Sequence, residues 1–159
     1  PQTLWDNTPG MDAALRRLLD SAGVPVVTSS AMYQDAFYDP DALCITVSSR
    51  LTDGQTFAAL SREVIHAGIH DRGRYPYYSR EDCAMDAECV SYMLCRNFGV
   101  NAPRPDVSRM GQVFDDMEAQ DRRSIVDSLQ KYFRRLQKDI QRELAPQERR
   151  RPEQNRPVR

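Results

Sequence analysis

The two histidines of the chain, His66 and His70, lie four residues apart in a segment that also holds Arg62 and Glu63. Residues four apart share one face of an α-helix. This spacing lets a His-Glu-x-x-His segment bind zinc, because two imidazoles reach one ion and the glutamate polarises the bound water. The segment therefore has the residue types of a metal-dependent hydrolase, and their order decides what chemistry remains.

The motif is interrupted in both registers in which it can be read. Arg62-Glu63-x-x-His66 keeps the base and the second histidine, but the guanidinium at the first ligand position has no lone pair for a metal. His66-Ala67-x-x-His70 keeps two imidazoles and has alanine in place of the base. Glu63 is about 10 Å along the helix axis from His70, too far for both to bind one ion. We predict that neither register forms a competent hydrolase, and we expect Glu63, His66 and Arg62 to make polar contacts at the helix surface.

A loop of arginines and tyrosines follows this segment, with cations at Arg72, Arg74 and Arg80 around Tyr75, Tyr77 and Tyr78. Cations beside aromatic rings are typical of surfaces that bind single-stranded nucleic acid, although such loops also contact proteins. The loop is a candidate nucleic-acid contact through Arg72, Arg74, Tyr75 and Tyr77.

Composition limits the classes of function. The formal net charge is −1, from 22 basic and 23 acidic residues, which argues against a generic polyanion-binding surface. Apolar runs are short, so we expect no membrane span and no secretory signal. The four cysteines form no Cys-x-x-Cys pair, which favours reduced thiols in a cytoplasmic protein. Because the chain begins at Pro1, we expect a processed or excised piece of a larger protein.

The elements before the histidine segment mix helix and strand. Apolar residues at helical spacing predict a first helix that Gly23 ends. Three β-rich stretches follow, at 24–28, 36–38 and 43–47, and the last two read as a hairpin around a turn at 39–42.

The second half of the chain is helical. One predicted helix carries the histidines and has Thr52 or Asp53 as its cap. A second runs from Ser79 to about Asn97, and a long amphipathic helix covers 120–144. We predict a single α+β domain over 1–145, with a small antiparallel sheet and three helices after it, and a disordered Arg/Pro/Glu-rich tail or linker over 146–159.

The order and wording of these elements resemble a known family of small zincin-type metallopeptidase domains. The family occurs in phage-repressor-cleaving and radiation-response peptidases, and in antirestriction and polyvalent proteins of conjugative mobile elements. The first stretches that carry the resemblance are Ala36-Phe37-Tyr38-Asp39-Pro40, Ile45-Thr46-Val47 and Phe57-x-x-Leu60-x-Arg62-Glu63-x-x-His66-Ala67. The later ones are Asp86-Ala87-Glu88-Cys89-Val90-Ser91-Tyr92-Met93-Leu94-Cys95-x-x-Phe98-Gly99-Val100 and Met117-Glu118-Ala119-Gln120-Asp121.

The resemblance implies a small sheet packed on a zincin-like helical core, with metal held by two histidines and an acid. By position Glu63 matches the base and His66 the second histidine, so Glu63 is a vestigial base. Arg62 replaces the first histidine, and Asp86 or Glu88 falls near the third ligand. We expect no metal and no other cofactor, with Arg62 as a cleft residue whose guanidinium pairs with Glu63 or Glu88.

The resemblance also implies a setting, a cytoplasmic protein of a bacterial mobile element. The chain would then be a non-catalytic binding or scaffolding module whose partners are the neighbouring domains of that protein. One alternative is a zinc peptidase that uses His66, His70 and Glu88 or Asp86. A further alternative is a nucleic-acid-binding accessory domain, and the long helix could pair with a second copy of the chain.

Overall fold

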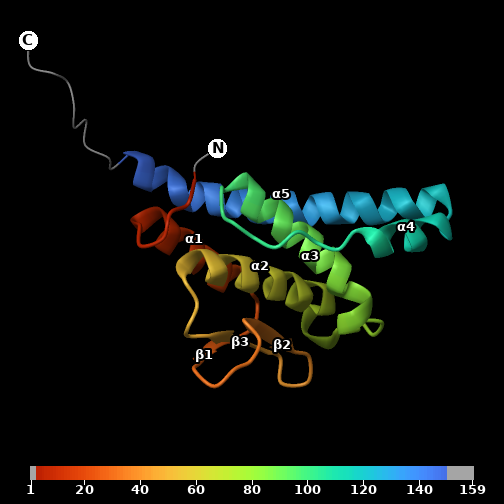
Figure 1. Ribbon diagram of the computed structural model, residues 1–159, viewed down its shortest axis with the longest axis horizontal. Helices are drawn as coiled ribbons and strands as arrows, with labels where there is room; N and C mark the ends of the chain where they lie inside the picture. The colour runs from red at the N-terminus through yellow and green to blue at the C-terminus, as the bar shows by residue number, and fades with distance from the viewer. Residues whose placement is uncertain (1–2, 150–159) are drawn as a thin grey trace, which may run out of the picture.

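The computed structural model describes residues 3–149, without the side chains of 109 and 146–149. It is an α+β fold in which α2 lies between a three-stranded sheet and the remaining helices (Figure 1). In chain order the elements are α1 (Pro9–Ser21), β1 (Val26–Ser29), β2 (Ala36–Asp39), β3 (Cys44–Ser48), α2 (Asp53–His70), the 3-10 turn η1 (Asp71–Gly73), α3 (Arg80–Asn97), α4 (Ser108–Asp115) and α5 (Ala119–Arg149).

The sheet is mixed, so the predicted antiparallel sheet is wrong in part. The hairpin is confirmed: β2 pairs antiparallel with β3, and Tyr38 lies opposite Ile45. β1 instead runs parallel to β3, with Val26 opposite Ile45, and the strand order is β1-β3-β2. Because β2 already occupies one edge of β3, β1 takes the other edge. The connection over 30–35 then returns the chain to the far side of β3, so that β1 and β3 run in the same direction.

α2 carries the histidine segment and is fixed at both ends. Thr52 caps it: its hydroxyl accepts the Gln55 N–H, and the Gln55 side chain accepts the Thr52 N–H, which is a capping box. Of the two predicted caps, the structure thus selects Thr52. At the other end Asp71 adopts a left-handed conformation with φ 50° and stops the helix. The predicted apolar stripe of α2 lies in the core, with Phe57, Leu60 and Val64 buried.

α3 begins and ends where expected, at the Ser79 cap and before Gly99, whose φ is +65°. A further helix, α4, follows, so four α-helices come after the sheet within residues 3–149, and not the predicted three. α4 was not predicted, because it is short, has Gly111 in its middle and has no side-chain cap hydrogen bond at Val107.

α5 confirms the predicted long amphipathic helix and packs against α1 and α3. Leu136, Ile140 and Leu144 on its apolar stripe are buried in the core. The helix continues to Arg149, so the first residues of the predicted tail are helical; the rest of that tail, 150–159, lies outside the described residues. None of the described helices is long and apolar enough to cross a membrane.

The cap on α2 yields a first prediction. Thr52→Ala removes one half of the capping box and lowers the free energy of unfolding by about 1 kcal/mol. Urea denaturation measures the difference. Ser49→Ala is the control, because Ser49 is exposed and its hydroxyl makes no hydrogen bond among the described residues. Equal losses in both variants would contradict the assigned cap.

Candidate functional site

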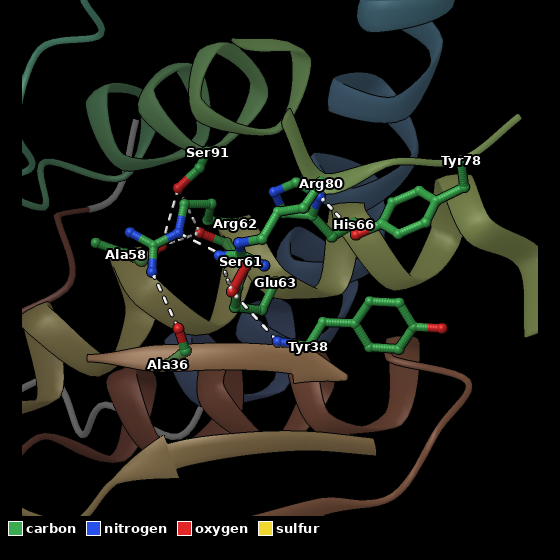
Figure 2. Close-up of polar contacts among 10 residues, drawn as sticks. All are labelled: Ala36, Tyr38, Ala58, Ser61, Arg62, Glu63, His66, Tyr78, Arg80 and Ser91. Carbon is green, nitrogen blue, oxygen red and sulfur yellow. Dashed lines mark hydrogen bonds and ion pairs between the residues drawn. The ribbon is translucent and has the colours of Figure 1, made fainter. Parts of the chain in front are cut away.

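Glu63 lies in the interior, where α2, β2 and the start of α3 meet. Its side chain is 0% exposed. One carboxylate oxygen, Oε1, accepts two hydrogen bonds: from the Tyr38 N–H at 3.3 Å and from Arg80 Nη2 at 2.6 Å. Figure 2 shows the carboxylate between the β2 backbone and Arg80. The expectation of polar contacts at the helix surface is therefore wrong for Glu63, and also for His66, which is 1% exposed.

Arg80 is the principal counter-charge of Glu63. It is the first residue of α3, and its guanidinium carbon lies 4.8 Å from the centroid of the Phe37 ring. The face of the ring attracts the cation, although the Arg80 side chain stays 34% exposed. A buried carboxylate is tolerated when such a partner is close and hydrogen-bonded. The sequence analysis grouped Arg80 with the cations around the loop tyrosines and did not connect it with Glu63, which it contacts in the structure.

Arg62 forms a second and longer contact with the same carboxylate. Its Nε lies 3.6 Å from Glu63 Oε2, so the expected Arg62–Glu63 pair is confirmed, while no such pair with Glu88 is found among the described residues. At 3.6 Å the contact is an ion pair without a hydrogen bond, and both atoms lack a hydrogen-bond partner within the described part of the chain. Two guanidiniums thus share one carboxylate, which leaves a surplus of positive charge.

The same residues close the outer edge of β2, which is an edge strand of the sheet. Glu63 accepts the Tyr38 N–H, and Arg62 Nη2 lies 3.5 Å from the Ala36 carbonyl oxygen (Figure 2). An open edge strand offers its free N–H and C=O groups to another chain. Here α2 side chains occupy one donor and one acceptor of that edge.

Both imidazoles face tyrosine hydroxyls. His66 Nδ1 lies 3.2 Å from the Tyr78 hydroxyl, and His70 Nδ1 lies 2.5 Å from the Tyr38 hydroxyl. Burial, then the charges of Arg80 and Arg62, lowers the pKa of His66 to about 4. Burial raises the pKa of Tyr78 to about 12. His66 is therefore neutral at pH 7, and a hydroxyl that donates to its Nδ1 leaves the ring proton on Nε2.

The remaining acids of the predicted metal set lie elsewhere. Asp86 lines a cavity of about 430 Å³ beside α5, and Glu88 lines one of about 540 Å³ beside Arg62. Within the described side chains, no group of three histidines, cysteines or acids is arranged to hold a metal ion. The donor set around Glu63 does not fit zinc, because two cationic guanidiniums stand beside the base and no acid among the described residues completes a ligand set with the two histidines.

The part of the arginine–tyrosine loop from Arg72 to Tyr77 lies outside this site, whereas Tyr78 and Arg80 contact His66 and Glu63. Tyr77 is 79% exposed, and Tyr75 packs edge-on against it with ring centroids 5.9 Å apart. Arg74 pairs with Asp71 at 3.4 Å, and Arg72 Nε donates to the Gly23 carbonyl at 2.9 Å. Sequence reasoning missed that Tyr38 and Tyr78 face the histidines; the fully buried position of Tyr38 depends on the β2 register, which no local pattern reveals.

Comparisons with protein-family models, with curated proteins and with solved structures give no match for this chain. The resemblance to the zincin-type domains stays a prediction carried by the residues quoted above.

The two guanidiniums predict different stabilities. Arg80→Met leaves the Glu63 carboxylate buried without its short partner and lowers the free energy of unfolding by about 3 kcal/mol or more. Arg62→Met removes a contact that is 3.6 Å long and has no hydrogen bond, and it costs about 1 kcal/mol. Urea denaturation at pH 7 ranks the variants. A larger loss for Arg62→Met would contradict the assignment of Arg80 as principal partner.

His66 predicts a pH dependence. In the unfolded chain a histidine binds its proton near pH 6.5, whereas the folded chain binds it at about 4, so the unfolded state holds more protons between these values. Neutral His66 therefore contributes stability above pH 6.5. As the pH drops through that window, this contribution is lost and the free energy of unfolding falls by about 3 kcal/mol.

The measurement compares wild type with His66→Gln by urea denaturation from pH 7 to pH 4. Acidic groups contribute equally to both proteins, so the difference isolates His66. We expect a flatter profile for the variant. Parallel profiles would show that His66 is not a neutral, desolvated imidazole.

Proposed function

We propose that this chain is a non-catalytic, zincin-like binding or scaffolding module, in which arginines replace the metal ion beside a vestigial base. The observation that carries the proposal is the engagement of Glu63. A general base needs a carboxylate oxygen within reach of a water molecule. Glu63 Oε1 is held by Arg80 and the Tyr38 N–H, and Oε2, which has no hydrogen-bond partner among the described residues, lies 3.6 Å from Arg62 Nε in a side chain that is 0% exposed.

The histidines support the same proposal. Zinc binds neutral imidazoles. The other ring nitrogen of a metal-bound histidine donates its N–H to a carboxylate, carbonyl or water. Here His70 Nδ1 faces the Tyr38 hydroxyl, His66 Nδ1 faces the Tyr78 hydroxyl, and the charges of Arg80 and Arg62 lower the pKa of His66. A cation entering this site would meet two guanidiniums and only one carboxylate to neutralise them.

The setting that we propose follows from the resemblance: a module within a larger cytoplasmic protein of a bacterial mobile element, beside other domains of that protein. The same geometry makes a zinc peptidase built on His66, His70 and an acid of α3 less favourable. Asp86 and Glu88 line different cavities.

Metal content tests the proposal. The full chain, purified without chelator and without added zinc, is analysed by elemental mass spectrometry and then titrated with zinc. We expect far less than stoichiometric zinc and no uptake, because the cation position is taken by Arg80 and Arg62. Stoichiometric zinc that disappears in both His66→Gln and His70→Gln would overturn the proposal.

The Arg62→His variant sharpens the experiment, because it restores the His-Glu-x-x-His order while leaving Arg80 in place. We expect no stoichiometric zinc in this variant either, since Arg80 still holds Glu63. Uptake of zinc by Arg62→His would show that Arg80 does not stand in for the ion.

A further inference from the structure

We propose that a groove between the arginine–tyrosine loop and α5 binds single-stranded nucleic acid, with phosphates at its arginine end and a base at its tyrosine end. The groove consists of two cavities of about 420 and 430 Å³. The side chains of Tyr132 (α5) and Ile65 (α2) line both cavities, so the two cavities are neighbours. The inference builds on the proposed function, because it names the partner class of that module.

The first cavity is rich in arginine and suits phosphate. Arg17, Arg72, Arg74 and Arg135 line it, together with Asp20, Asp71 and Asp139. Two of the acids are already engaged, Asp71 by Arg74 at 3.4 Å and Asp139 by Arg17 at 3.7 Å. Arg135 forms no ion pair among the described residues, and its planar fork of N–H donors matches a phosphate.

The backbone at Arg72 is strained in a way that favours this role. Asp71 and Arg72 are consecutive non-glycine residues with φ of 50° and 54°. Such left-handed conformations cost of order 1 kcal/mol each and gather at functional sites. The result is that Arg72 reaches across to the Gly23 carbonyl and forms a wall of the cavity.

The second cavity suits a base. Tyr75, Tyr132 and apolar side chains line it, with Ser124, Ser128 and Asp86 as hydrogen-bonding groups. Tyr77 does not line this cavity, but it is 79% exposed and its ring forms a T-shaped contact with that of Tyr75, which does. Exposed tyrosines next to arginines act as stacking platforms for successive bases.

The surface beyond the groove extends the positive charge. Lys131, Arg134 and Lys138 are exposed on α5 next to Arg135 and form no ion pair among the described side chains. The net charge of the whole protein is −1, so this local cluster of positive charge is not evident from the composition. A single-stranded backbone could follow α5 from the groove.

Fluorescence anisotropy tests the proposal with labelled oligothymidine and oligouridine of about a dozen nucleotides, a length within the usual site size. We expect saturable binding of at least one of them, and the two probes separate DNA from RNA. Tyr77→Ala weakens binding about tenfold through the lost stacking. Arg135→Gln weakens it and reduces the slope of log K against log salt by about 0.7.

Matched controls lie away from the groove. Tyr33→Ala removes a fully exposed tyrosine between β1 and β2, and Arg50→Gln removes an exposed arginine after β3. Both should leave the affinity unchanged, while the arginines at the end of the chain contribute equally to every variant. Equal losses in the control and groove variants would overturn the proposal.

Two further outcomes would also overturn it: no saturable binding of either oligonucleotide, or displacement of the oligonucleotide by a polyglutamate peptide at equal concentration, which would indicate an acidic protein partner. Neither outcome depends on Glu63 or on zinc. A failure here is therefore distinct from a failure of the proposed function.

Discussion

The fully buried carboxylate of Glu63 must be neutralised and hydrogen-bonded, and much of the molecule is arranged to meet this constraint. α2 carries the carboxylate, the β2 backbone supplies an N–H, and Arg80 at the start of α3 supplies the charge. The three elements are far apart in the chain. The Ser79 cap starts α3 at Arg80, which places this arginine within 2.6 Å of Glu63 as its short charged partner.

Hydrogen bonds between α2 and α3 hold these two helices together near the Glu63–Arg80 pair. Ser91 of α3 donates to the Ala58 carbonyl of α2 at 2.9 Å and contacts the Ser61 hydroxyl at 2.9 Å (Figure 2). These short side chains let the two helices approach closely beside Glu63. The site is thus held by hydrogen bonds on both sides, which favours a structural role for residues that resemble catalytic ones. The groove proposed to bind nucleic acid is lined by the loop and α5.

Much of the fold was predictable from local signals. The apolar stripes of α2 and α5, the Ser79 cap and the 36–47 hairpin are all written in adjacent residues. The parallel pairing of β1 depends on which edge of β3 is free, and α4 has neither a cap hydrogen bond nor an uninterrupted helical sequence. Those features follow from the assembled structure.

The site was predictable in its membership but not in its environment. Arg62, Glu63 and His66 stood out by residue type and spacing, and the pair between Arg62 and Glu63 followed from charge. That Glu63 and His66 are buried, and that Arg80 turns inward, depends on contacts between elements separated by loops. A helix wheel cannot show which face a sheet will cover.

Glu63 and Arg80 are expected to contribute to the free energy of unfolding as a coupled pair. A double-mutant cycle with Glu63→Gln, Arg80→Met and the combined variant measures this directly by urea denaturation at pH 7. We predict a coupling free energy of about 3 kcal/mol, because a neutral residue 63 no longer needs its cation. A coupling within about 0.5 kcal/mol of zero would contradict the account, because the two changes would then be independent.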